Sequence, residues 1–160
     1  MFLFVRTELH QMELPHNKRI AAFIQANKIL TLCCIDADNK PYCFHCFYAF
    51  DEENHLLFFK SSAETHHAKL LLLNPSVAGS VLPEKVDILA LKGIQLAGTI
   101  LYNDIPGPAD PAAFYHKKFP FAFAKSGRVW CIQIDSIKMT DNTIVFGKKL
   151  EWHRNELIPA

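Results

Sequence analysis

The sequence predicts an α+β, mainly β protein: a six-stranded antiparallel split β-barrel with two to four helices. Two observations favour this fold. Three apolar and aromatic segments follow one another between residues 29 and 60 with hairpin-length connections, and further strand-like segments then alternate with helical ones. With 160 residues, of which 13 are Phe, the chain is long enough to bury one substantial core. We therefore expect a single domain over residues 1–160.

The first predicted element is an amphipathic helix over residues 16–27. Ile20, Phe23, Ile24 and Asn27 recur there at helical spacing, so these side chains would share one face of the helix. After Asn27 the sequence changes to β-branched and aromatic residues, which predicts that the helix ends there.

Strands and short turns account for most of the remaining chain. The first three predicted strands cover residues 29–35, 42–50 and 55–60, separated by the turn sequences ADNKP and DEEN. The later elements are strands over residues 76–82, 88–102 and 129–139, a helix over residues 112–119, and short closing strands over residues 143–146 and 150–152. The segment 88–102 is too long for a straight strand and contains Gly93 and Gly98, so we expect it to be bent or bulged.

The junction between the third strand and the next helix is the most informative feature. Ser61 with Glu64 fits a capping box, and Asn74-Pro75 is a helix stop. Helix N-termini favour anions, because they present unpaired N–H groups and the positive end of the helix dipole. The junction adds basic and hydroxyl side chains: Lys60, Ser61, Ser62, Thr65, His66, His67 and Lys69. This pattern predicts a phosphate-binding site, with ordinary capping residues on a solvated helix face as the alternative.

Several other functions are disfavoured by the sequence. The formal net charge is +1 without a basic block, so we expect no nucleic-acid partner. Residues 1–5 are too few for a signal-peptide core or a membrane span, so no membrane association is expected either. Five cysteines without regular spacing indicate a reduced, cytoplasmic protein. No nucleophile elbow, phosphate-binding loop or dinucleotide fingerprint is present.

The cysteine-rich second strand suggests a zinc site, but the strand geometry does not favour one. Cys43 and His45 would share one face of the strand while Cys46 points to the other, which leaves two ligands where a structural site needs four. Cys33 and Cys34 likewise point to opposite faces. We therefore expect free cysteines and no bound metal.

The order of these elements resembles a known superfamily. Three strands, a Lys/Ser/Thr-rich helix start, Asn74-Pro75 and a Val-Ala strand resemble the pyridoxamine-phosphate-oxidase-like, FMN-binding split barrels. Within that superfamily the chain is most similar to the bacterial YhbP-like proteins, from the first helix to Trp152. The matching residues are Thr65, His66, His67 and Ala68, Lys92 to Gln95 with Gly98, and the runs KMTDNT and FGKK after residue 137.

This resemblance implies a homodimer with two FMN molecules at the subunit interface. The implied cofactor-binding residues are Phe44, His45, Cys46, Phe47, Phe59, Lys60, Ser61, Ser62, Thr65, His66, His67, Lys69 and Gln95. Two features depart from the oxidase pattern. An arginine expected early in the second strand is replaced by Cys43 and Phe44, and the C-terminal Arg-Leu-x-Pro is not reproduced. Pyridoxamine phosphate is therefore not the expected substrate.

The resulting functional prediction is an FMN-dependent oxidoreductase of unknown substrate, in which the flavin supplies the redox chemistry. The alternatives are a non-catalytic FMN- or heme-binding dimer, with His45 or His66 as an axial heme ligand, and a structural or regulatory dimer. The sequence identifies no catalytic acid or base. Tyr115, His116, Lys117 and Lys118 could line a substrate entrance, or simply form an exposed helix.

Overall fold

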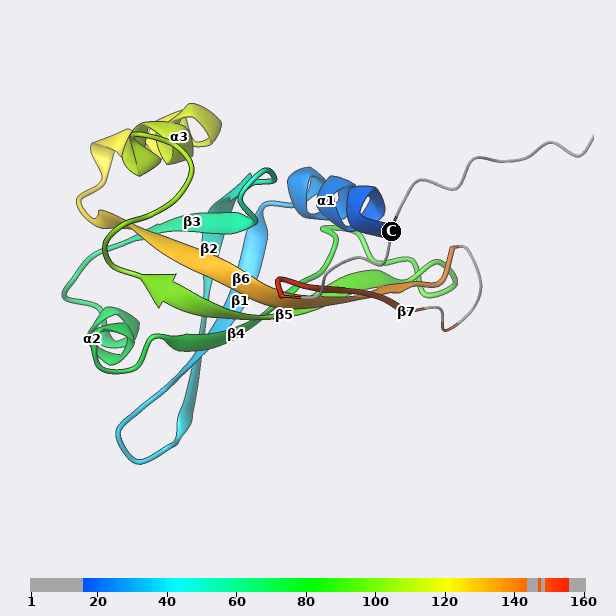
Figure 1. Ribbon diagram of the computed structural model, residues 1–160, viewed down its shortest axis with the longest axis horizontal. Helices are drawn as coiled ribbons and strands as arrows, with labels where there is room; N and C mark the ends of the chain where they lie inside the picture. The colour runs from blue at the N-terminus through cyan, green and yellow to red at the C-terminus, as the bar shows by residue number, and fades with distance from the viewer. Residues whose placement is uncertain (1–15, 144–146, 148, 156–160) are drawn as a thin grey trace, which may run out of the picture.

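The computed structural model of the chain describes residues 16–143, 147 and 149–155 (Figure 1). Its elements are, in chain order, α1 (His16–Ala26), β1 (Ile29–Ile35), β2 (Pro41–Asp51), β3 (Leu56–Ser61), α2 (His66–Leu73), β4 (Ser76–Val81), β5 (Lys92–Leu101), α3 (Pro111–Lys118), the 3₁₀-helix η1 (Pro120–Ala124), β6 (Arg128–Asp141) and β7 (Lys149–His153). Most of the predicted closing strand over residues 143–146 lies outside the described residues, as do the apolar residues 1–5.

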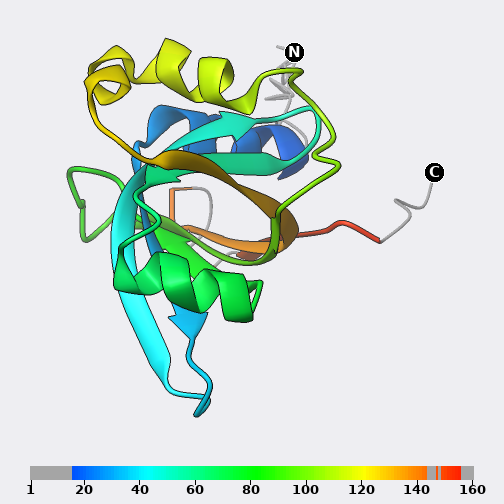
Figure 2. The same cartoon turned by 90° about the vertical axis from the view of Figure 1, so that its left-hand side faces the viewer.

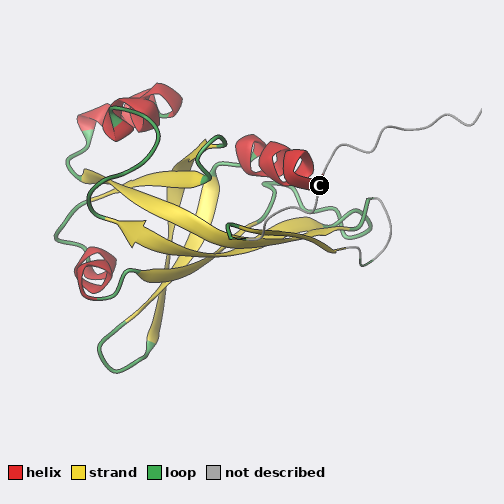
Figure 3. Cartoon of the chain, in the orientation of Figure 1, coloured by secondary structure: helices red, strands yellow, loops and turns green. Residues whose placement is uncertain are grey.

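The strands form one antiparallel sheet that closes into a barrel. Their order is β3-β2-β1-β4-β5-β6-β7, and β3 also pairs with β6. Six strands therefore make the closed barrel, and β7 extends it as a short addition to β6. The helices lie outside this barrel of strands (Figure 3). The predicted six-stranded antiparallel barrel with a few helices is confirmed.

Strand β5 differs from the prediction because it begins later. It covers Lys92–Leu101 rather than residues 88–102. Ile88 and Leu89 lie in the preceding loop and are 86% and 87% exposed. The predicted irregularity is present, since the β5–β6 register shifts between Ala97 and Gly98. A Cβ atom on Gly98 would lie 2.6 Å from the Gln133 carbonyl oxygen, so only glycine permits this close approach.

The barrel interior forms the main hydrophobic core. Alternate residues of the strands point into it, and α1 packs against β2 and β7. Ile20, Phe23 and Ile24 of the helix are buried there, as its predicted apolar face requires. The buried Tyr48 hydroxyl donates a 2.7 Å hydrogen bond to the Ile24 carbonyl, which ties the helix to β2.

A second, smaller cluster lies on the outside of the barrel, where α3 and η1 cover β2, β3 and β6 (Figure 2). Tyr115, Phe119 and Ala122 pack there on Ala49 and Phe58. The 3₁₀-helix was not predicted. It follows α3 directly, because Pro120 has no N–H group with which to continue the α-helix. This packing brings η1 to the end of β3.

Candidate functional site

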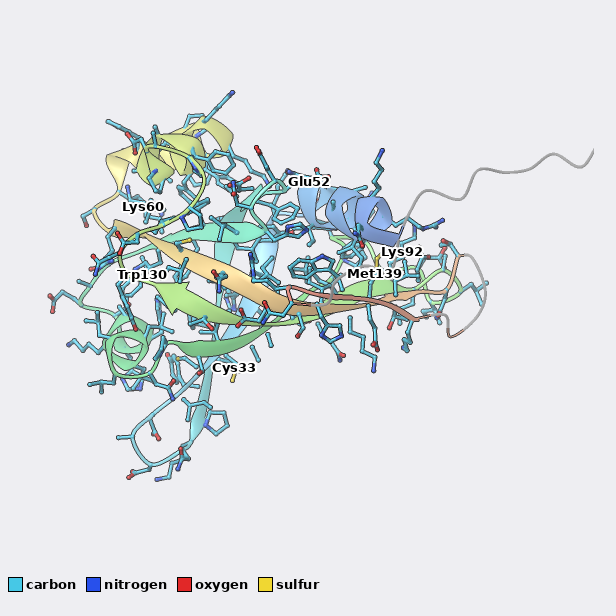
Figure 4. All side chains as sticks on the ribbon, in the orientation of Figure 1. Cys33, Glu52, Lys60, Lys92, Trp130 and Met139 are labelled. Atoms are coloured by element: carbon cyan, nitrogen blue, oxygen red, sulfur yellow. The ribbon has the colours of Figure 1, made fainter. Side chains whose placement is uncertain are left out.

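A cavity of about 290 Å³ opens at the end of the barrel, between α2 and α3. Lys60 and Trp130 lie at this end of the barrel (Figure 4). The residues that line the cavity come from β2, β3, α2, α3, and η1 with the loop after it: Phe44, His45, Cys46, Phe47, Lys60, Ser61, Ser62, His67, Tyr115, Phe121, Ala122, Lys125 and Ser126. Eight of these residues were predicted as cofactor-binding residues from the sequence, four on β2 and four at the strand–helix junction.

Helix α2 begins at His66 and is capped by Thr65, whose hydroxyl accepts a hydrogen bond from the Ala68 N–H. The predicted capping box of Ser61 and Glu64 is therefore wrong. The chain makes a turn after β3 before the helix begins, in which the Glu64 N–H donates to the Ser62 hydroxyl. This turn leaves the Ser61 and Ser62 side chains to line the cavity.

Ser61 and His67 form a hydrogen-bonded pair in the wall of the cavity. The Ser61 Oγ lies 2.6 Å from the His67 Nε2, and the imidazole stacks on the Phe44 ring with centroids 3.8 Å apart. Burial, and secondarily the neighbouring His66, lower the pKa of His67. The imidazole is therefore neutral at neutral pH, and an anion bound beside it would raise this pKa.

Lys60 places a positive charge at the cavity. Its Nζ donates to the Ala122 carbonyl at 2.9 Å and lies 3.1 Å from the His116 Nε2. An ammonium group has three N–H donors. These two contacts fix the ammonium and leave one N–H free to donate to a ligand.

The loop before β6 adds Lys125 and Ser126 to the same end of the cavity. Gly127 has a φ of +134°, and a Cβ atom there would lie 2.9 Å from the Ser61 carbonyl carbon. Glycine therefore allows the loop to pack directly on the end of β3. The Arg128 guanidinium lies 4.4 Å above the Trp130 ring, which adds a further cation close to this loop. The loop carries no sequence motif from which its place at the cavity could be predicted.

Part of the cavity lining is aromatic and uncharged. Phe47 and Phe121 form it and remain 41% and 57% exposed. Burial, with a smaller contribution from the Cys46 thiol, raises the pKa of Tyr115 to about 12, and burial raises the pKa of Cys46 to about 12. Both groups therefore stay protonated and neutral at neutral pH. The cavity lining thus combines cationic and hydroxyl side chains with aromatic ones.

Three residues of the predicted junction lie near the cavity but do not line it. Phe59 is fully buried in the barrel core. Thr65 is the N-cap of α2, and its hydroxyl lies 3.2 Å from the Ser61 Oγ. The His66 ring packs edge-on against Tyr42, with centroids 4.7 Å apart. These three residues contribute to the packing around the site and not to the surface of the cavity.

Two other predicted residues lie away from the cavity. Lys69 is exposed on α2, and its Nζ lies 4.0 Å from a Glu64 carboxylate oxygen. Gln95 is on β5 and lines a different hollow, together with Lys138 and His153. Within one chain, neither side chain joins the group around Lys60.

The proposed entrance helix is divided between two environments. Tyr115 lines the cavity and His116 contacts Lys60. Lys117 is exposed, and the Lys118 Nζ lies 5.1 Å from the Tyr48 ring centroid.

In the part of the chain that the structure describes, no three His, Cys, Asp or Glu side chains are placed to hold one metal ion. None of the described helices is long and apolar enough to cross a membrane.

Known proteins resemble this chain in sequence and in structure. No protein-family model matches the chain. Over 139 residues the chain is 40% identical to a UPF0306 protein of Yersinia pseudotuberculosis and to one of Yersinia pestis, covering 86% of this chain and 92% of each relative.

The solved structures are similar in fold at low sequence identity. A heme-binding protein from Mycobacterium smegmatis has a TM-score of 0.73 at 14% identity, covering 88% of this chain and 59% of that one. A FAD-binding protein from Mesorhizobium loti has a TM-score of 0.63 at 16% identity, covering 78% and 93%. A Clostridium acetobutylicum protein of the pyridoxine-phosphate oxidase family has a TM-score of 0.62 at 12% identity, covering 89% and 98%. The fold is thus similar to that of these three proteins, and by its sequence the chain belongs to the UPF0306 family.

Proposed function

We propose that this protein is an FMN-binding homodimer of the YhbP-like branch and acts as an FMN-dependent oxidoreductase. The observation that carries this proposal is a cavity whose lining includes both cationic and hydroxyl side chains and uncharged aromatic ones. FMN has matching chemical parts, a phosphate joined by a ribityl chain to a flat aromatic ring system. The FAD-binding and oxidase-family proteins of the same fold support a flavin as the ligand.

The cationic and hydroxyl side chains fit a phosphate group. Lys60 has one N–H beyond its two contacts, and Ser61, Ser62, Lys125 and Ser126 line the same cavity. Hydrogen bonds between charged donors and phosphate oxygens are stronger than neutral ones. These side chains would therefore hold the phosphate and fix the orientation of the ligand.

The size of the cavity supports a homodimer. Its volume of about 290 Å³ in one chain lies just below the roughly 300–1,000 Å³ typical of small-molecule sites. One chain would thus enclose only part of FMN. Phe47 and Phe121 stand exposed at the rim, where apolar side chains favour contact with a partner. A second copy of the chain covering this rim would complete each site.

Bound FMN would supply the electron-transfer chemistry. The residues of this chain would bind and orient it and keep water from its apolar part. Because Tyr115 and Cys46 stay protonated, they would place no negative charge in the aromatic part of the cavity.

Heme is the second candidate ligand. His45 lines the cavity and its side chain is exposed, so it is available as an axial ligand. His67, in contrast, is already hydrogen-bonded to Ser61 and stacked on Phe44. The heme-binding protein from Mycobacterium smegmatis, which has the same fold, supports this alternative.

An absorption spectrum of the purified protein, before and after adding FMN or hemin, tests the proposal. We expect bound-flavin bands that bleach on anaerobic addition of a reduced nicotinamide and return with an electron acceptor. Flavin bands that no reductant bleaches would support binding without turnover. A Soret band without flavin binding would favour heme, and a protein that binds neither would refute both assignments.

A further inference from the structure

Cys33 of β1 and Cys43 of β2 lie directly opposite each other in the antiparallel pair. The Asp36 N–H donates to the Lys40 carbonyl, and the Tyr48 N–H donates to the Lys28 carbonyl. In an antiparallel ladder, hydrogen-bonded and non-hydrogen-bonded pairs alternate. With hydrogen-bonded pairs at these two positions, Cys33 and Cys43 form a non-hydrogen-bonded pair.

This type of pair brings two side chains closest together. Opposite Cα atoms in a non-hydrogen-bonded pair are about 4.5 Å apart, and a disulfide requires a Cα separation of roughly 4.4–6.8 Å. Burial, and secondarily the neighbouring Cys43 thiol, raise the pKa of Cys33. The two thiols can therefore be joined without moving either strand.

The pair is also accessible on the outside of the hairpin. Cys43 is exposed and Cys33 is partly exposed, on a hairpin that projects from the barrel in both ribbon views (Figures 1 and 2). Cys34 and Cys131 are buried, and Cys46 points to the opposite face of β2, into the cavity. The fold thus presents one exposed dithiol.

We propose that Cys33 and Cys43 form a reversible cross-strand disulfide by exchange with a small-molecule disulfide such as oxidised glutathione. The Cys43 thiolate attacks one glutathione sulfur, forms a mixed disulfide and releases one reduced glutathione. Cys33 loses its proton and attacks the Cys43 sulfur, which releases the second reduced glutathione. Two protein thiols are thereby oxidised while one glutathione disulfide is reduced. The inference does not depend on the ligand of the cavity.

The bond would act on the cavity wall through β2. Cys43 lies between Tyr42, which contacts His66, and Phe44, which stacks on His67. The bridge closes only the short hairpin loop, so it stabilises the fold less than a disulfide between distant segments would, and an exposed bond of this kind is readily reduced. These properties fit a reversible modification rather than a structural staple.

Intact-mass measurement of the folded protein after incubation with oxidised glutathione tests this proposal. The wild-type protein should lose two hydrogen atoms in mass, regain them with dithiothreitol, and yield a peptide pair linking Cys33 and Cys43. Cys33→Ser should instead gain one glutathione at Cys43. The matched control Cys46→Ala should behave as the wild type does, because Cys46 lies on the other face of the strand.

Two results would overturn the proposal. One is a stable glutathione adduct on the wild-type protein without loss of the two hydrogen atoms, which would show that Cys33 cannot reach Cys43. The other is a folded protein in which neither thiol reacts until it is denatured. Circular dichroism of Cys33→Ser, compared with the wild type, ensures that an adduct is measured on the folded state.

Discussion

Replacing Lys60 with alanine should weaken FMN binding selectively. The Nζ has one N–H left after its contacts with Ala122 and His116, so the substitution removes one charged hydrogen bond to the phosphate. Such a bond contributes about 1.5–3 kcal/mol, which corresponds to a roughly 10- to 150-fold increase in Kd at about 1.4 kcal/mol per tenfold. Riboflavin, which has no phosphate, should bind the variant about as well as it binds the wild type.

Flavin fluorescence titrations with FMN and riboflavin measure this difference, and Lys69→Ala is the matched control. Lys69 is exposed and its only described ion pair is with Glu64, which is also exposed, so its removal should change the FMN Kd by less than about threefold. The reasoning is refuted if Lys69→Ala weakens FMN binding and Lys60→Ala does not. Equal weakening of FMN and riboflavin by Lys60→Ala would also refute it, because the lysine would then support the fold rather than the phosphate.

Three further predictions concern the same site. Gly127→Ala should destabilise the protein by about 1–3 kcal/mol, because Gly127 has a positive φ and packs directly against Ser61. This loss should appear as a lower melting temperature, and an unchanged Tm would contradict the close packing of this loop. The pKa of His67, which is lowered in the free protein, should rise when FMN binds. The affinity for FMN should therefore fall as the pH increases through the bound-state pKa of His67. An NMR titration of the imidazole that shows no rise in pKa on FMN binding would place the phosphate elsewhere. The double variant Phe47→Ser/Phe121→Ser should shift the protein from dimer toward monomer in light scattering, and an unchanged dimer would exclude this rim from the interface.

Much of the barrel could be predicted from local sequence. The bounds of β1 to β3 agree with the prediction within about one residue, because Asn39, Pro41 and Asn54 mark the turns between apolar segments. Strand β5 was predicted too long, since the apolar Ile88 and Leu89 resemble strand residues although they have no neighbouring strand to pair with.

Only part of the candidate site could be predicted in the same way. Lys60, Ser61 and His67 are close in sequence, so the strand–helix junction identified them together. Lys125 and Ser126 reach the site because β3 pairs with β6, a contact between distant segments that no local pattern reveals. The same holds for the Cys33–Cys43 pair, which depends on the register of β1 and β2.

The direction of Lys69 illustrates another limit. A lysine in the first turn of a helix suits a phosphate site, and the sequence offers no local reason to exclude it. The structure places Ala68, Leu70 and Leu71 on the buried side of α2, so Lys69 points outward. Which face of a short helix is buried depends on the sheet beneath it, and therefore on the whole fold.

The most direct test of the central claim is a map of amide chemical-shift changes in the protein upon addition of FMN. We predict that the largest changes occur at Ser61, Ser62 and Ser126, where the cavity offers hydroxyl and cationic groups to a phosphate. Changes confined to other surfaces, with none at these three residues, would contradict the claim that this cavity binds the phosphate of FMN.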